Sequence, residues 1–268
     1  MKIKHILILF LLPIFFAACE KEEEIPEEET HLISIAKSDS ESGVFSVDLM
    51  AEQTLFQGYN KLYFDIENNS DKSPVTQASV SILPMMHMTT MTHAAPFENP
   101  ENTVNENGYF EGAAVFIMPG NPDEGWELRV AIDDGGIKDT TYLTIPEVTG
   151  LDEAREFSAV SEADGKTYFI SLLEPSVPEV GMNDIGFTVH YRENMMSFPA
   201  AENLSISIEP EMPSMGHGSP NNVNPTHMGN GHYKGKVNFT MTGWWRVNIE
   251  ISKDGEPIGN ELSFDITF

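Results

Sequence analysis

The stretch WRVNIEI, residues 245–251, places an apolar side chain at every second position. Polar residues alternate with its apolar members, which are Trp245, Val247, Ile249 and Ile251. A period of two over seven residues is typical of a β-strand with one buried face and one face in solvent. The stretch therefore predicts a half-buried strand near the end of the chain.

The same alternation recurs at residues 75–83, 126–132 and 203–209. From His31 onward the chain shows almost no helical period, and turns rich in Gly, Pro, Asn and Asp separate its short apolar runs. Many short strands joined by such turns predict an all-β protein, built as a sandwich or a barrel.

An internal repeat divides this part of the chain into two similar halves. Residues 58–66 align with residues 181–189 at an offset of 123 positions. In both copies a loop containing Met and His follows, and then a Tyr-led strand, a Met-x-Gly turn and a Trp-led strand. We predict a tandem duplication of one β module of about seven strands, the number in a simple β-sandwich. The first module is predicted at residues 31–148 and the second at 149–268.

The second copy carries the motifs MPSMGHG at 212–218 and GHYKGKVNFTM at 231–241, followed by Gly-Trp-Trp at 243–245. In this combination it resembles the YtkA-like family of extracytoplasmic β-sandwich domains. The first copy has the same order of features but departs in detail, with MMHMTTMTH at 85–93. The resemblance implies two immunoglobulin-like sandwiches and a link to copper or to the assembly of respiratory oxidases.

Two Met/His motifs single out a candidate metal site in each module. MTTMTHAAP at 88–96 and MPSMGHGSP at 212–220 both read Met-x-x-Met-x-His-x-x-Pro, at an offset of 124 positions. Thioethers and an imidazole form a soft ligand set, which favours Cu(I) over Zn²⁺, Mg²⁺ or Ca²⁺. We therefore predict copper, and Cu(I) in particular, as the bound metal. The predicted ligands are Met88, Met91 and His93 in the first module and Met212, Met215 and His217 in the second.

These motifs lie in two predicted loops, 84–107 and 210–231, each longer than the usual connection between strands. Further donors in the same loops are candidates for an extended site. They are Met85, Met86 and His87 in the first loop and His227, Met228 and His232 at or just beyond the end of the second. His31 and His190 lie outside both loops, and we expect them to be structural or surface histidines.

A third group recurs further along each copy and consists of Met118, Met241, Trp126, Trp244 and Trp245. A Met/His cluster beside a Trp ring would resemble the periplasmic Cu(I) carriers of the CusF type, which use a cation–π contact. However, a strand of about eight residues intervenes and would carry the chain about 25 Å from the loop. We therefore expect these residues at the opposite end of each sandwich, in core or hairpin roles.

Two alternatives to metal binding remain for the loop methionines. Met fills irregular gaps in apolar cores, and the loop residues would then be structural. Met-rich exposed loops also serve as adaptable surfaces for docking other proteins.

The N-terminus predicts export and a lipid anchor. Lys2 and Lys4 precede the apolar run 6–16, which is too short to cross a bilayer and is typical of a signal peptide. This run leads into Phe-Ala-Ala-Cys, which resembles a bacterial lipobox and makes Cys19 the lipidated residue. We predict a signal peptide at 1–18 and, at 19–30, the lipidated cysteine with an acidic tether. The tether resembles the acidic segment of surface lipoproteins of the Bacteroidetes.

Composition narrows the class of function. A formal net charge of −27 repels phosphate backbones, so we expect no nucleic-acid partner. No Ser/His/Asp order, nucleotide-binding glycine motif or repeated carboxylate pair indicates an enzyme. We predict a copper-binding lipoprotein of the bacterial cell envelope, anchored in the outer membrane. It would be a carrier, buffer or delivery factor that serves a membrane copper transporter or a copper enzyme. The alternative is an adhesion or complex-assembly protein of the same fold that binds no metal.

Overall fold

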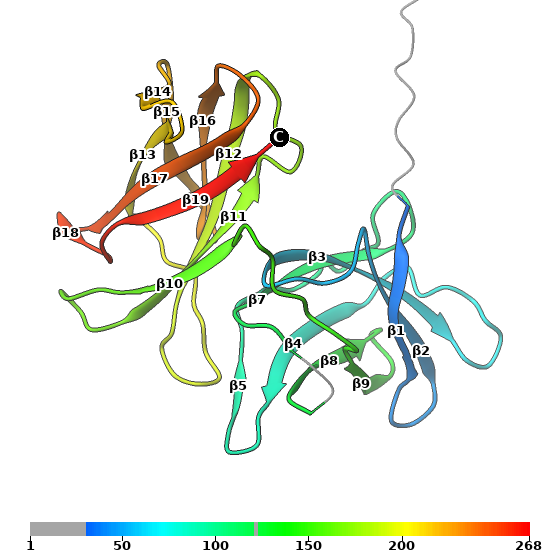
Figure 1. Cartoon of the computed structure of the whole chain (residues 1–268). Coiled ribbons are helices and arrows are strands. Elements are labelled where there is room, and N and C mark those ends of the chain that lie inside the picture. Colours follow the sequence, from blue (N-terminus) through cyan, green and yellow to red (C-terminus); the bar gives the residue numbers. More distant parts are fainter. Residues whose placement is uncertain (1–30, 121–122) are drawn as a thin grey trace, which may run out of the picture. The chain divides into compact units, whose positions relative to one another are not determined.

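The computed structural model describes residues 31–120 and 123–268. The predicted signal peptide at 1–18, Cys19 and the acidic tether at 19–30 lie outside the described residues. Within the described ranges the chain forms antiparallel β-strands joined by turns and loops (Figure 1). Nothing in these ranges forms a helix of the length and apolarity needed to cross a bilayer.

The first module is a sandwich of two sheets. One sheet has the order β1-β2-β3-β7-β6, and the other has the order β5-β4-β8-β9. The first sheet contains β1 (Ile33–Asp39), β2 (Phe45–Ala51), β3 (Gly58–Asn68), β7 (Phe110–Phe116) and β6 (Phe97–Glu98). The second contains β5 (Thr92–Ala94), β4 (Ser79–His87), β8 (Gly125–Asp133) and β9 (Lys138–Thr144).

The second module repeats this arrangement. One sheet has the order β10-β11-β12-β16-β15, and the other has the order β14-β13-β17-β18, with β19 also paired to β17. The first of these contains β10 (Glu156–Val160), β11 (Thr167–Glu174), β12 (Gly181–Tyr191), β16 (His232–Phe239) and β15 (Val223–Gly229). The second contains β14 (His217–Gly218), β13 (Ser205–Met212), β17 (Trp244–Lys253), β18 (Glu256–Pro257) and β19 (Leu262–Thr267).

Each sandwich has its own apolar core. One cluster of buried side chains runs from Phe45 to Val148 and the other from Ala159 to Ile266. The alternation that predicted β17 matches its burial, because Trp245, Val247, Ile249 and Ile251 are all buried. The prediction of an all-β chain of two tandem β-sandwiches is therefore confirmed.

A buried asparagine fixes the start of the same strand in both modules. The Asn60 side chain donates to the carbonyls of Phe56 and Gly58, at 2.7 and 2.9 Å, and its Oδ1 accepts from the Phe56 N–H. Asn183 makes the same three bonds with Glu179 and Gly181. Because these bonds satisfy backbone groups where β3 and β12 begin, the side chain replaces a missing strand partner.

Replacing Asn183 with alanine is expected to lower the free energy of unfolding by about 1–3 kcal/mol, because part-buried backbone groups at Glu179 and Gly181 lose their partners. Urea unfolding followed by circular dichroism measures this loss. Asn248→Ala, on the half-buried face of β17, is the control and should change stability by no more than about 0.5 kcal/mol. Equal losses in the two variants would contradict the role assigned to Asn183.

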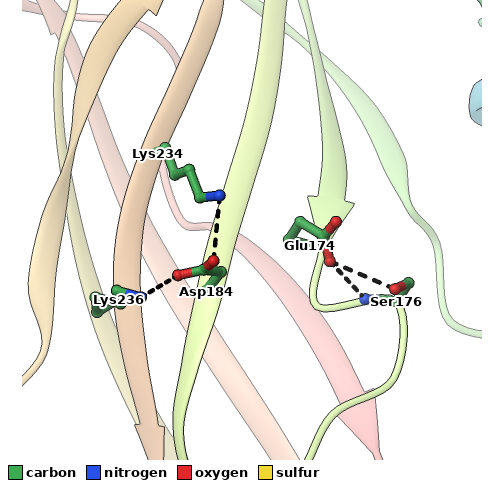
Figure 2. A network of polar contacts seen from close by, with 5 residues as sticks. All are labelled: Glu174, Ser176, Asp184, Lys234 and Lys236. Atoms are coloured by element: carbon green, nitrogen blue, oxygen red, sulfur yellow. Dashed lines mark hydrogen bonds and ion pairs between the residues drawn. The ribbon is translucent and has the colours of Figure 1, made fainter. Parts of the chain in front are cut away.

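The outer face of the β12–β16 pair carries charged residues. Asp184 on β12 lies between Lys234 and Lys236 on β16 and forms ion pairs with both (Figure 2). The hydrogen bond from Lys236 is the main cause that lowers the pKa of Asp184, and the bond from Lys234 adds to it. At the end of β11, Glu174 accepts hydrogen bonds from Ser176. This face of the second module therefore meets solvent, while the opposite face packs on the core.

The two long predicted loops contain strands. Segment 84–107 holds the end of β4, all of β5 and all of β6, and segment 210–231 holds the end of β13, β14 and β15. After β6 the first segment runs back along the sandwich, where Gln77 bridges Thr103. The next strand, β7, therefore ends at Phe116 close to the β4–β5 hairpin. This reversal changes which residues lie near the Met/His motifs.

Candidate metal site

In the first module the candidate ligands lie on the β4–β5 hairpin. Met86 pairs with His93, and the Met88 N–H donates to the Met91 carbonyl at 2.9 Å across a two-residue turn. Because side chains alternate along a strand, Met86, Met88, Met91 and His93 share the inward face of the hairpin. Met86 and His93 are buried, Met88 packs partly buried against the core, and Met91 is 50 % exposed at the tip. The structure therefore brings the three predicted ligands together and adds Met86 to them.

In the second module the hairpin joins β13 to β14. Met212 pairs with His217, and the Met212 carbonyl accepts hydrogen bonds from the N–H groups of Met215 and Gly216. Gly216 has a φ of 65°, a left-handed conformation that suits glycine at the end of such a turn. Met212 is buried, His217 is half-buried, and Met215 is 62 % exposed. The three predicted ligands again belong to one hairpin.

The histidine in each hairpin packs against a buried tryptophan. The ring centroids of His93 and Trp126 are 5.7 Å apart, and those of His217 and Trp245 are 5.9 Å apart, both in edge-to-face arrangement. The indole N–H of Trp126 donates to the Met118 carbonyl at 3.1 Å, and that of Trp245 donates to the Met241 carbonyl at 2.9 Å. His93 and His217 therefore have equivalent neighbours in the two modules.

The hydrogen bonds of the two imidazoles indicate which ring nitrogen carries a proton. Nδ1 of His93 lies 2.8 Å from the Ala94 carbonyl, and Nδ1 of His217 lies 3.0 Å from the Gly218 carbonyl. A carbonyl only accepts, so Nδ1 carries the proton in both rings and Nε2 of the neutral ring keeps its lone pair. Metal-binding histidines commonly hold their second nitrogen in this way. Both Nε2 atoms are therefore chemically suited to bind a metal ion.

The expectation that Met118, Met241 and the tryptophans lie at the far end of the sandwich is wrong. The preceding segment runs back along the module, so the strand that follows it returns to the same end as the hairpin. Trp126 and Trp245 lie against the histidines, and the backbone of Met118 and Met241 adjoins their indoles. Trp244 differs, because it is 38 % exposed on the outer face of β17 beside Arg246.

The structure also changes which residues correspond between the modules. Met86 lies opposite both His93 and Trp126. Met212 lies opposite His217. The β13–β17 ladder ends at the pair Glu211–Arg246, and extending its register by one residue places Met212 opposite Trp245. Met212 is therefore the counterpart of Met86, and not of Met88 as the shared motif suggests. The motif aligns two turns of different length, which the sequence alone does not reveal.

The other candidate donors of the first loop, Met85 and His87, do not lie on the inward face, because side chains alternate between the two faces of a strand. Met85 and His87 flank Met86 on β4 and point to its outer face. There His87 Nε2 lies 3.3 Å from Glu127 Oε1. The structure does not bring these two side chains to the Met/His cluster.

The extra donors of the second module lie elsewhere on the sandwich. His227 and Met228 are on β15, where His227 pairs with Tyr233, and His232 begins β16. The ring of Trp245 contacts Phe239, at the other end of β16. Phe239 lies seven positions after His232 along this strand, which is about 23 Å. His227, Met228 and His232 are therefore remote from His217.

His31 and His190, which lie outside both loops, differ in burial. His31 is exposed and His190 is buried, where loss of solvent lowers the pKa of His190 to about 4. Among residues 31–120 and 123–268, no three His, Cys, Asp or Glu side chains are placed to hold a metal ion.

The sequence of the second module also matches a known family. The family model described as YtkA-like matches residues 162–250. The C-terminal half thus contains a YtkA-like domain. This domain includes β13, β14 and the start of β17, and so contains Met212, Met215, His217 and Trp245. A search of curated proteins finds no match to the chain.

Several solved bacterial structures match the chain at low identity and low TM-score. They include FdeC, an Escherichia coli adhesin, at 16 % identity and a TM-score of 0.27, and the integrin-binding protein invasin, at 13 % and 0.27. InvD of Yersinia pseudotuberculosis is 17 % identical, with a TM-score of 0.24. These alignments cover 80 %, 89 % and 80 % of the present chain, respectively. The chain spans only 59 %, 39 % and 54 % of those proteins, and the similarity concerns the fold alone.

Proposed function

We propose that each module binds one Cu(I) ion at the inward face of its Met/His hairpin. In the first module the ligands are His93 Nε2 with the thioethers of Met88 and Met91, and Met86 lies beside them. In the second they are His217 Nε2 with the thioethers of Met212 and Met215. Thioether and neutral imidazole donors suit Cu(I), while Zn²⁺ and Cu(II) favour harder or more basic sets.

The observation that best supports the proposal is that His93 and His217 make the same contacts in the two modules. Each Nδ1–H is held by the carbonyl of the next residue, and each ring packs on a buried indole. A fixed tautomer directs Nε2 to the metal, as in known metal sites. The adjoining indole adds cation–π stabilisation to a bound cation. Core packing alone does not require the same Nδ1 hydrogen bond in two modules.

We further propose that the protein is a lipid-anchored carrier, buffer or delivery factor in the bacterial cell envelope, and not an enzyme. Lipidation at Cys19 would hold both modules close to a membrane, and the acidic tether would give them reach. A membrane copper transporter or copper enzyme would then receive or supply the ion. The exposed methionines at the hairpin tips are accessible to such a partner.

Anaerobic titration with Cu(I) against a competing chelator tests metal binding. The full chain in detergent is expected to bind two equivalents. Met88→Leu with Met91→Leu should remove one equivalent, and Met212→Leu with Met215→Leu should remove the other. Leucine keeps the apolar volume and removes the sulfur, so the fold is retained.

Met182→Leu with Met228→Leu is the control, because both residues are exposed and lie outside the hairpins. This variant should still bind two equivalents. An adhesion or complex-assembly protein would bind no Cu(I) in any of these forms. Loss of binding in the control alone would place the metal elsewhere.

A further inference from the structure

The two hairpins differ in how many sulfur donors face inward. The first has three thioethers on that face, from Met86, Met88 and Met91, because its two-residue turn is flanked by two methionines. The second has at most two, Met212 on its strand and Met215 in its four-residue turn. A third sulfur near the first site provides a replacement donor whenever one Cu–S bond opens. A metal ion in the first hairpin therefore has more ways to remain bound.

The histidines differ in access to solvent. His93 is 5 % exposed, and the residue that follows it, Ala94, is fully buried. His217 is half-buried, and Gly218 after it is exposed. An incoming ligand from another molecule must reach the metal from the solvent side. The second hairpin leaves more room for that approach.

The turns differ in how they are held. The N–H and Oγ1 of Thr89 both donate to Oε1 of Glu124, at 3.1 and 2.8 Å, and these bonds lower the pKa of Glu124. The second turn, Pro213–Gly216, ends at a glycine with open space around its Cβ position, and β14 is only two residues long. Short exposed segments with few contacts open at low free-energy cost. The second hairpin should therefore open more readily.

From these differences we infer that the first hairpin retains Cu(I) and that the second exchanges it with a partner. The inference depends on the proposed function. In the exchange step, a thiolate, thioether or imidazole of the acceptor forms a bond to Cu(I) while a bond to Met215 or His217 breaks. The ion stays Cu(I) throughout, so no electron is gained or lost.

The test is release of Cu(I) from the full chain in detergent, loaded with two equivalents, after rapid mixing with excess bicinchoninate. The coloured chelate should form in two phases of equal amplitude, with rates that differ at least about tenfold, since related sites differ mainly in dissociation rate. Met212→Leu with Met215→Leu should remove the fast phase. Met88→Leu with Met91→Leu should remove the slow phase.

A second variant tests the cause of slow release. Glu124→Gln weakens the bonds that hold Thr89, and it should speed the slow phase several-fold while two equivalents still bind. Asp133→Asn, at the far end of β8, is the control and should leave both phases unchanged. Two equivalents released at one rate, or a fast phase that belongs to the first hairpin, would overturn the inference alone. A protein that binds no Cu(I) would overturn the proposed function itself.

Discussion

Replacing Trp245 with alanine is expected to lower the free energy of unfolding of the second module by about 3–5 kcal/mol, the usual loss for a large aromatic side chain in a core. Trp245 is completely buried, packs on Phe239 with ring centroids 5.4 Å apart, and donates its indole N–H to the Met241 carbonyl. Its removal leaves a cavity and leaves the Met241 carbonyl without its donor. Chemical denaturation followed by circular dichroism measures the loss.

The neighbouring residue provides a matched control. Trp244 has the same side chain but lies on the outer face of β17, 38 % exposed, where it adjoins Arg246 at 5.2 Å. Trp244→Ala should cost no more than about 1 kcal/mol, the range of an exposed cation–π contact. If both variants lose the same stability, the assignment of Trp245 to the core beneath His217 is wrong.

The second large effect concerns a buried carboxyl group. Glu156 on β10 is buried, its Oε1 has no hydrogen-bond partner within the described residues, and its other oxygen accepts from Gln57 Nε2 at 3.0 Å. Burial raises the pKa of Glu156 from 4.5 to about 7, and the Gln57 bond offsets only part of this. The folded protein therefore favours the protonated, neutral form.

The sign of the pH effect follows from proton binding. Below about pH 4.5 the group is protonated in both folded and unfolded chains, so it costs nothing. As the pH rises from there to about 7, the unfolded chain loses its proton first and the folded state is progressively penalised. Above that window the penalty is constant, at about 3 kcal/mol from about 1.4 kcal/mol per pH unit.

Glu156→Gln should therefore be more stable than the natural protein at pH 8 by about 1–3 kcal/mol and equally stable at pH 4. Urea unfolding at several pH values measures the difference between the two proteins. Both proteins contain His190, so the difference between them cancels its contribution. The pKa of His190 is lowered to about 4, so this residue changes stability in the opposite direction over an overlapping pH range. Glu162→Gln, an exposed carboxyl, is the control. A constant difference from pH 4 to pH 8 would contradict the argument.

The strands and their buried faces were predictable because apolar and polar residues alternate along the sequence with a period of two. Trp245 and the three apolar residues that alternate after it illustrate this, since each occupies the face that the pattern assigns to it. The grouping of Met88, Met91 and His93 was also predictable, because their spacing fits one hairpin. Local patterns fix local structure wherever side-chain alternation alone decides which face is buried.

The sequence named Met86 only as a further donor and did not predict that it lies opposite His93, nor that Trp126 lies near His93. Both depend on the β4–β8 register and on the reversal of segment 84–107, which are set by contacts between distant residues. The shared Met-x-x-Met-x-His motif also misaligned the modules, because the two turns differ in length by two residues. An alignment of the modules on Trp126 and Trp245, the residues opposite these methionines in the neighbouring strand, would have matched Met86 with Met212.

The pairing of each histidine with a core methionine constrains how these hairpins can diverge. Met86 and Met212 close the apolar interior and at the same time adjoin the histidines. A mutation there changes stability together with any ligand role, so selection cannot adjust one property without the other. Variation among descendants should therefore accumulate at the solvent-facing tips, at the positions of Met91 and Met215, where a substitution leaves the sandwich intact.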